Sequence, residues 1–600
     1  MLTITAYLLA GVLIAFALDL VFVELVLILV FRAAGRLFLQ PWLDQVERYC
    51  ARLAIHRDLC VAMAFIVPIL IRVALLPFDP MPQPWIPDEF SHLLIGDTLA
   101  HGRFANPTHP LWQHFESVHI FFQPTYASSY FPGLGIVLAL GELLGHPWVG
   151  VLLSSGAMCA ALLWMLYGFF PARWALLGGV LAVLRWGALS YWVNGYWGGT
   201  VAAAAGALVL GAYARLRKRA SVSSGLLMGL GLVFLAYSRP LEGLALAVPV
   251  AFALAWHYRK PARFPDFARI AVPITLVVAI GLMGLGAYFK AVTGSPFVMP
   301  YRMNQAMYAW PLTLPWEHLK PTSYQHTDMQ LYYEWERCMQ FQKTWPKQAF
   351  IFAPVHLAPL WRFFAGPALT VPLLGILRWW MDRRIRLLLV SLIASLTVAW
   401  IIVAYPHYVA PATACFLGLC VQGFRHLRAN ERKTSRSGLM WSRIAVTACL
   451  VMLPVRAFVD STKIQSLRPA MHIFSALGVG QGWWRADILR RLQAIPGRHV
   501  VFVQYDRPAY LTTEWVYNDA DIDRSQVVWA QDMGPEENQE VLRYYADRKM
   551  WLVRVDDSPG ELLPYDANLA HKDVLNPLHT DTCFAAPKDV VDSKVHLPKK

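Results

Sequence analysis

Long apolar runs recur along this chain and constrain its fold more than any other feature. About twelve segments approach the ~20 apolar residues that an α-helix needs to cross a bilayer. They lie near residues 5–31, 59–77, 149–170, 174–193, 198–214, 222–238, 241–257, 269–290, 357–379, 387–404, 408–424 and 443–459. Because backbone groups in lipid must be bonded within their own segment, such runs predict spanning helices. The expected fold class is a polytopic α-helical membrane protein.

Charged residues are scarce, which narrows the class of protein further. Apolar residues make up 56% of the chain and charged residues 15%, and the mean hydropathy is +0.40. A soluble chain carries about 25% charged residues, because its surface faces water. This composition excludes a soluble globular enzyme, a disordered hub and a disulfide scaffold. It also excludes a nucleic-acid binder, since the net charge of +14 is not gathered on one solvated face.

Arginine and lysine residues in the connections orient the bundle. They crowd residues 32–57, 215–219, 259–269, 378–386 and 425–443. The positive-inside rule places these connections in the cytoplasm. Residues 78–130 contain a single basic residue, Arg103. We therefore expect a first external loop at 78–148 and a second at 291–356. The apolar stretch 131–145 would reverse this order if it crossed, so it is expected to lie in the outer interface.

The C-terminal part of the chain is polar and has short β-branched runs between amphipathic helices. The pattern predicts a helix at 484–495, strands at 499–505 and 526–530, a helix at 535–546 and a strand at 550–555. The expected organisation is an extra N-terminal span with its cytoplasmic connection (1–58), a transmembrane module (59–459) and a small external α/β domain (460–600).

Two adjacent carboxylates, Asp88 and Glu89, open the first external loop shortly after a span. In a loop with almost no basic partners a carboxylate resists ionisation, which is how a general base acquires a raised pKa. The alternative is that the two acids simply begin an interfacial helix after Pro87, with His92 one turn beyond Asp88.

Aromatic and polar side chains that suit a sugar gather near the same outer surface. Tyrosine and tryptophan rings stack on sugars, and amide, carboxylate and imidazole groups bond hydroxyls, although an aromatic belt at the membrane interface explains the rings equally well. The candidates for sugar or acceptor binding are His92, Glu116, Tyr130, Trp192, Asn194, Tyr196, Trp197, Glu242 and His407.

Two arginines stand out by their surroundings. Arg239 lies in a very short external turn, where it is one of few outer cations and suits a lipid phosphate. The alternative is a simple pair with Glu242. Arg185 lies inside an expected span, where a charge is costly and suggests a function.

Several of these motifs, in this order, resemble those of the GT-C fold membrane glycosyltransferases, in the bacterial protein O-mannosyltransferase and aminoarabinose-transferase-like branch. The motifs are the Asp88-Glu89 pair after a span, Tyr130-Phe131-Pro132-Gly133-Leu134-Gly135, Ser238-Arg239-Pro240 and Gly294-Ser295-Pro296-Phe297. The resemblance covers about residues 59–424. The chain departs from the family at Phe131, where a second proline is frequent, in the extra span 5–31 and in the α/β tail.

The resemblance implies an inverting enzyme that moves a sugar from a polyprenyl-phosphate-linked donor to a lipid, glycan or protein acceptor. Asp88 matches the catalytic carboxylate and would act as general base. Glu89 would position the acceptor or support the ionisation of Asp88, and Arg239 would neutralise the departing lipid phosphate. No cofactor is expected; no ligand cluster in the sequence argues for a metal, and a divalent metal stays an open alternative.

The expected location is the bacterial inner membrane, with the active site and the C-terminal domain in the periplasm. A transporter or flippase of a lipid-linked sugar is the main alternative, although the chain lacks the repeat symmetry typical of transporters. A non-catalytic membrane scaffold is the third possibility, and it predicts that Asp88→Asn would be silent.

Overall fold

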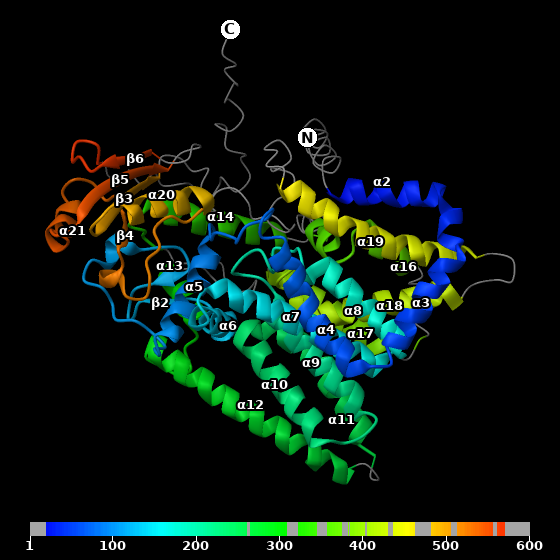
Figure 1. Cartoon of the computed structure of the whole chain (residues 1–600). Coiled ribbons are helices and arrows are strands. Elements are labelled where there is room, and N and C mark those ends of the chain that lie inside the picture. The colour runs from blue at the N-terminus through cyan, green and yellow to red at the C-terminus, as the bar shows by residue number, and fades with distance from the viewer. Residues whose placement is uncertain are drawn as a thin grey trace, which may run out of the picture.

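A computed structural model describes residues 20–260, 264–308, 322–344, 357–374, 382, 385–402, 405–429, 436–461, 482–505, 513–555 and 561–570. Most of these residues form an elongated bundle of helices, and a small sheet lies at one end of it, beside α5, α13 and α14 (Figure 1). The bundle helices are α2 (Leu20–Ala33), α3 (Pro41–Leu53), α4 (Arg57–Ala74), α7 (Pro147–Phe169), α8 (Ala172–Ala182), α9 (Thr200–Leu216), α10 (Val222–Ser238), α11 (Pro240–Tyr258), α12 (Phe264–Thr293), α16 (Gly366–Leu373), α17 (Arg386–Ile402), α18 (Thr413–Ala429) and α19 (Ser437–Ser461).

Each expected apolar run contains a helix over residues that the structure describes. Four of these helices, α7, α11, α12 and α19, are long and apolar enough to cross a membrane, and a fifth results if α3 and α4, bent by 107°, count as one span. The other helices are shorter. The chain therefore has the composition of a multi-pass membrane protein, while the number of twelve spans stays a prediction.

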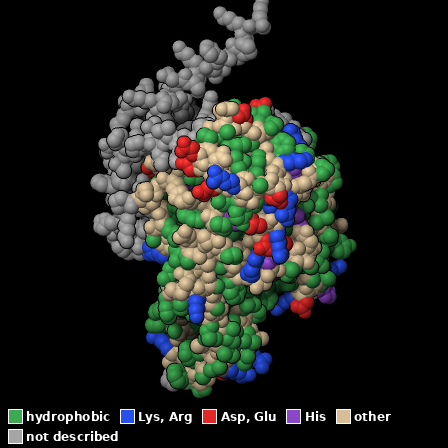
Figure 2. Space-filling view, turned by 90° about the vertical axis from the view of Figure 1, so that its left-hand side faces the viewer, with side chains coloured by type: hydrophobic (Ala, Val, Ile, Leu, Met, Phe, Trp, Pro, Cys, Tyr) green, Lys and Arg blue, Asp and Glu red, His purple; other side chains and the backbone are tan. Residues whose placement is uncertain are grey.

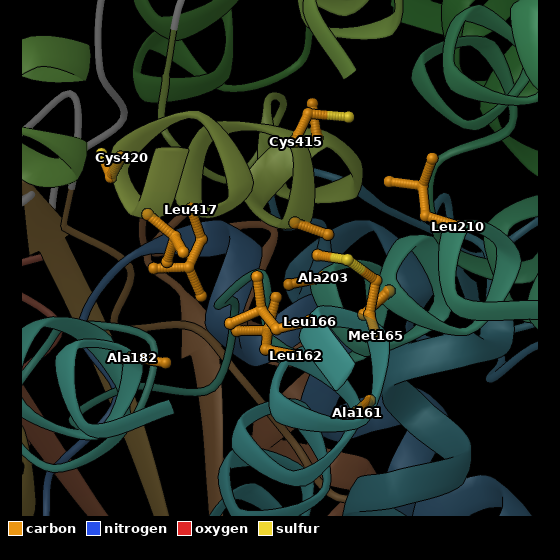
Figure 3. Packing of buried hydrophobic residues seen from close by; sticks show 14 of the residues in the cluster. Ala161, Leu162, Met165, Leu166, Ala182, Ala203, Leu210, Cys415, Leu417 and Cys420 are labelled. Atoms are coloured by element: carbon orange, nitrogen blue, oxygen red, sulfur yellow. The ribbon is translucent and has the colours of Figure 1, made fainter. Parts of the chain in front are cut away.

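Helix α7 lies at the centre of the bundle and packs against α4, α6, α8 and α9. Side chains of α7, α8, α9 and α18 meet in its core (Figure 3), where Leu162, Leu166 and Leu210 are fully buried. Small residues bring backbones together, as is common between membrane helices. At Gly206 of α9 a Cβ atom would lie 2.0 Å from the Pro411 carbonyl oxygen, so only glycine fits this contact.

Arg185, expected to be functional, has a buried partner in the extra N-terminal helix. It follows α8 in a turn of π-helix (Val183–Gly187), and its Nη1 lies 3.2 Å from Glu24 Oε2 of α2. Its Nε donates to the Phe363 carbonyl, and Glu24 also accepts from the Ala368 amide. The charge inside the bundle is thus paired, and it ties α2 to the segment around residues 362–368.

Residues 78–148, the expected first external loop, fold as α5 (Pro87–Ala100), a 3₁₀ turn (Trp112–Phe115), the antiparallel strands β1 (Ile120–Phe121) and β2 (Ala127–Ser128), and α6 (Pro132–Leu143). At about 1.5 Å per residue α6 is roughly 18 Å long. This is shorter than the ~30 Å hydrocarbon core, which agrees with the expectation that residues 131–145 do not cross.

The last described part of the chain forms a four-stranded sheet with helices. We call residues 482–505, 513–555 and 561–570 the C-terminal unit. Its elements are α20 (Gly482–Ala494), β3 (His499–Tyr505), β4 (Val527–Gln531), α21 (Asn538–Tyr544), β5 (Lys549–Val555) and β6 (Glu561–Pro564). Strand β3 pairs in parallel with β4 and β5, and β6 is antiparallel to β5.

The two faces of β3 pack on different partners. Val500 and Phe502 join a core with Leu94 and Phe115 of the first external loop, whereas Val501 and Val503 join a second core with Ile488 of α20. This alternation follows from the two-residue period of a strand. The C-terminal unit is therefore packed directly on the loop that carries Asp88.

On the face of the molecule in Figure 2, charged and apolar side chains lie in different parts. Charged side chains gather over the upper part of the face in Figure 2, and the lower part is mainly apolar. Helix α12, in the lower part of the molecule (Figure 1), exposes Val272, Leu276, Ile280 and Met283. Such a helix surface suits lipid rather than water.

Candidate functional site

A cavity of about 230 Å³ lies where α6, α9, α11 and α13 (Pro300–Tyr308) begin. It is lined by Phe131 and Leu134, by residues 197–199, 201 and 202, by the turn 238–242, by Met299, Tyr301 and Arg302, and by His92, Tyr130 and Tyr408. The first turn of a helix leaves backbone N–H groups without partners in the helix. The cavity therefore has these polar backbone groups beside its apolar side chains.

Arg239 is one of two arginines in this lining, and Arg302 is the other. It closes α10, and Pro240 begins α11 directly after it. The guanidinium lies over the Tyr408 ring, 4.1 Å from the ring centroid. Gly133 allows the start of α6 to reach this turn, since a Cβ there would lie 2.8 Å from the Tyr237 carbonyl oxygen. Glu242, also in the lining, is buried in the first turn of α11.

His92 presents a buried imidazole to the cavity. Its ring stacks on Tyr130 with centroids 4.6 Å apart and an interplanar angle of 22°. Among the described residues Nδ1 has no hydrogen-bond partner, although the side chain is buried. Burial, helped by Arg239 and His119, lowers the pKa of His92 to about 3. The ring is therefore neutral at physiological pH, and Nδ1 is a buried nitrogen that no described residue bonds.

Asp88 lies one hydrogen bond away from the cavity. It is the second residue of α5, and its Oδ1 accepts a hydrogen bond of 2.6 Å from the Tyr130 hydroxyl. Burial raises the pKa of Tyr130 well above its ordinary value, so the phenol stays protonated and keeps donating. Tyr130 is itself held by its backbone amide, which donates to Ser128 Oγ at 3.0 Å. The cavity and the carboxylate thus share one tyrosine.

Glu89 is not part of the cavity lining and accepts hydrogen bonds from the backbone. Its Oε2 accepts from the Trp85 amide at 3.0 Å, and its Oε1 accepts from the Tyr196 amide at 2.9 Å. It is 2% exposed, and burial raises its pKa to about 7, with the nearby Asp88 charge acting in the same direction. Glu89 therefore joins the start of α5 to the segment before α9.

His119 belongs to the same neighbourhood but is not among the site residues that the sequence analysis selects. Its backbone has a positive φ of 63°, a region that residues other than glycine seldom adopt. Its Nε2 lies 2.9 Å from the Tyr332 hydroxyl, and its carbonyl accepts from Ser91 Oγ at 2.8 Å. The ring also lies 5.3 Å from the Tyr130 ring. Neither the strained backbone nor these distant contacts have a signature in the sequence.

The structure divides the predicted sugar-binding residues into two groups. His92, Tyr130, Trp197 and Glu242 line the cavity with Arg239. The rest are engaged elsewhere. Trp192 is fully buried against Phe363, and Tyr196 donates from its hydroxyl to the Pro82 carbonyl.

Asn194 and His407 are also held by protein partners. Asn194 accepts from Arg72 Nε at 2.6 Å and donates to Asp79 Oδ2 at 3.0 Å, inside a buried ion pair between Arg72 and Asp79. His407 Nδ1 lies 3.0 Å from the Tyr191 hydroxyl. These contacts place both residues in the scaffold behind the cavity.

Glu116 contacts the second external loop. Its Oε1 accepts from the Tyr308 hydroxyl at 2.7 Å, and its Oε2 lies 3.5 Å from His326 Nε2. It joins the first loop to the region of α13 and α14 (Thr327–Thr344).

One group of side chains in the described part of the chain has the composition of a metal site. Asp97, His101 and Glu142, from the far ends of α5 and α6, place their ligand atoms within 4.8 Å of one another. None of the predicted site residues belongs to it. Asp97 is already bonded, because its Oδ1 pairs with His101 at 2.9 Å and its Oδ2 accepts from the Ala520 amide at 2.6 Å.

Comparison with known proteins gives matches among solved structures alone. No family model and no curated protein matches the chain. ArnT from Cupriavidus metallidurans bound to undecaprenyl phosphate is similar at 14% identity and a TM-score of 0.48, over 83% of this chain and 93% of that one. The Archaeoglobus fulgidus oligosaccharyltransferase tethered with an acceptor peptide is similar at 12% identity and a TM-score of 0.39, over 82% of this chain and 68% of that one.

These similarities concern the course of the chain and assign no residue.

Proposed function

We propose that this protein is an inverting membrane glycosyltransferase that moves a sugar from a polyprenyl-phosphate-linked donor to an acceptor. One observation carries the proposal: a cavity with apolar walls holds a cation, Arg239, and shares Tyr130 with a half-buried carboxylate, Asp88. A lipid tail, a phosphate and a base are the three elements that such a transfer needs in one place.

The donor phosphate fits the Arg239 end of the cavity. A guanidinium binds phosphate oxygens with parallel hydrogen bonds, and the Tyr408 ring beneath it holds the group in place. His92 adds a neutral ring nitrogen on the same wall. The apolar part of the lining, which includes Leu134 and Leu241, suits the first isoprene units of the carrier.

Asp88 is the proposed general base. Tyr130 bonds Oδ1, and within the described residues no donor is bonded to Oδ2, which is left for an acceptor hydroxyl. The acceptor oxygen attacks the anomeric carbon as its proton passes to Asp88. The bond from that carbon to the phosphate oxygen breaks, and polyprenyl phosphate leaves with the negative charge that Arg239 stabilises. A single displacement inverts the anomeric configuration.

The same proposal gives the chain about twelve spans in the bacterial inner membrane. The active site and an α/β domain formed by the C-terminal unit face the periplasm. The basic connections support this orientation, and the apolar surface of α12 supports its place in the membrane.

The experiment is a transfer assay with purified protein in nanodiscs and a mixed pool of radiolabelled polyprenyl-phosphate sugars. Wild-type protein is compared with Asp88→Asn and with Asp487→Asn, a control on α20 whose carboxylate pairs with Arg490 at the surface. We expect label to leave the carrier with wild type and the control. Asp88→Asn should be slower by roughly 10²–10⁴-fold, the range for loss of a general base.

Other results separate the remaining explanations. Equal rates for wild type and Asp88→Asn would remove Asp88 as the base. Label that stays on the carrier in nanodiscs but crosses the bilayer when the protein is placed in sealed vesicles would identify a flippase instead.

A further inference from the structure

The C-terminal unit reaches the start of α5 from behind the proposed site. Its residues 513–520, which we call the docking segment, run along the side of α5 that faces away from the cavity. The Glu514 amide donates to the Trp85 carbonyl at 2.9 Å, while the Trp85 amide donates to Glu89 at 3.0 Å. Trp85 is thus bonded on both sides, three residues before Asp88.

The Glu514 carboxylate makes a second connection to the first external loop. It is 3% exposed, and its Oε2 accepts from Ser117 Oγ at 2.9 Å and from the Val118 amide at 3.3 Å. Its Oε1 accepts from the Tyr505 hydroxyl at 3.1 Å and from the Val516 amide at 2.9 Å. One carboxylate therefore joins β3 to the residues that directly precede His119.

Arg485 of α20 holds the docking segment independently. Its guanidinium carbon lies 5.0 Å from the centroid of the Phe90 ring and 4.5 Å from the centroid of the Trp529 ring. Its Nε donates to the Trp515 carbonyl at 2.9 Å, and its Nη2 donates to the Tyr517 carbonyl at the same distance. Phe90 lies in α5 two residues after Asp88, so the helix start is held at a second point.

We propose that Glu514 is a positioning residue for the Asp88 site and that the docking segment sets where the start of α5 lies. This inference rests on the proposed function for its effect on catalysis. Glu514 is not part of the cavity lining. It acts through two segments, Trp85–Glu89 and Ser117–His119, on the carboxylate between them. A displacement of about 1 Å in such a group can cost on the order of 10²-fold in rate.

Glu514→Gln is the decisive variant. It keeps the shape of the side chain but replaces an oxygen that accepts two hydrogen bonds with an NH₂ group that can only donate. Asp487→Asn is the matched control, since it makes the same change of carboxylate to amide on the exposed surface of the same unit. Glu514→Ala is the stronger change, which leaves all four donors without their partner.

Two measurements on the full chain in nanodiscs test the proposal. Hydrogen exchange should become at least about tenfold faster in peptides that cover residues 85–92 and 117–119 of Glu514→Gln, and stay unchanged in α9 and α11. In the transfer assay kcat should fall about tenfold or more, while KM for the polyprenyl-phosphate sugar stays within about twofold, because Glu514 does not touch the cavity. The control should match wild type in both.

The outcomes are distinct. Unchanged exchange at residues 85–92 in folded Glu514→Gln would overturn the proposal, and so would a raised KM with an unchanged kcat. Wild-type protein that transfers no sugar would remove the proposed function alone. Faster exchange confined to the two segments would then still support the positioning of α5 by Glu514.

Discussion

The two sides of helix α5 differ in how completely their polar groups are bonded. On the cavity side, His92 keeps a buried ring nitrogen without a partner in the described structure, and Asp88 receives a single hydrogen bond from Tyr130. Outside the cavity lining, Glu89 accepts from two backbone amides, and Glu514 accepts four hydrogen bonds.

Under the proposed function, this difference separates groups that bind the substrate from groups that hold the fold. Leaving a buried polar group unbonded costs about 1–3 kcal/mol. A substrate that completes the bonding can offset that cost at a binding site. We therefore expect substitutions on the cavity side to change catalysis and those on the opposite side to change stability or geometry.

Arg239→Ala should give the largest effect on the cavity side after Asp88→Asn. It removes the cation that faces the departing phosphate, so kcat/KM should fall by about 10²–10³-fold, as for loss of one electrostatic group at a transition state. Arg239→Lys should restore only part of the activity, because an ammonium lacks the planar pair of donors. Initial rates over a range of donor concentrations measure both.

The control for Arg239 is Arg490→Ala, which removes a surface arginine from α20. It should match wild type. If Arg239→Ala kept wild-type kinetics, the cavity would not be the donor site, and the difference between the two sides of α5 would lose its functional meaning.

Glu89 should make stability depend on pH. Its pKa rises from 4.5 in the unfolded chain to about 7 in the folded one because of burial. Folding therefore favours the protonated carboxyl, and the stability that this group contributes is complete below pH 4.5 and lost as the pH rises through 7. The shift corresponds to roughly 3 kcal/mol at 1.36 kcal/mol per unit.

Thermal unfolding in detergent between pH 4.5 and 8 tests this. The midpoint temperature of unfolding should fall with rising pH in wild type. It should fall less in Glu89→Gln, whereas Asp487→Asn should behave like wild type. Identical pH profiles for wild type and Glu89→Gln would show that Glu89 does not titrate in this range, and would weaken its assignment to the scaffold.

The sequence predicts what local patterns determine. Strand β3 and helix α20 follow from periodicity within a few neighbouring residues, and the expected bounds match closely, 499–505 for the strand and 484–495 against Gly482–Ala494 for the helix. Arg239 and Tyr130 were found because they lie in short motifs. The structure places both in the lining of one cavity.

Contacts between distant segments could not be predicted from the sequence. Nothing near Arg185 indicates Glu24, which is 161 residues away. The aromatic run 191–197 has the composition of both a sugar platform and a packed core. Only the fold separates Trp197, which lines the cavity, from Trp192, which is fully buried. Arg302 and Tyr408 reach the cavity from segments with no pattern that marks them.

His92→Phe should give the smallest effect on the cavity side. Phenylalanine keeps a ring that can stack on Tyr130, and it removes only the nitrogens, so packing and stability should stay close to wild type. If Nδ1 bonds the donor, loss of one neutral hydrogen bond worth about 1 kcal/mol should raise the donor KM by roughly fivefold, with kcat unchanged.

His101→Phe, at the other end of α5 and outside the cavity lining, is the control. An unchanged KM for His92→Phe would show that the buried imidazole serves packing alone, and the cavity side of α5 would then owe its function to Asp88 and its neighbour Tyr130.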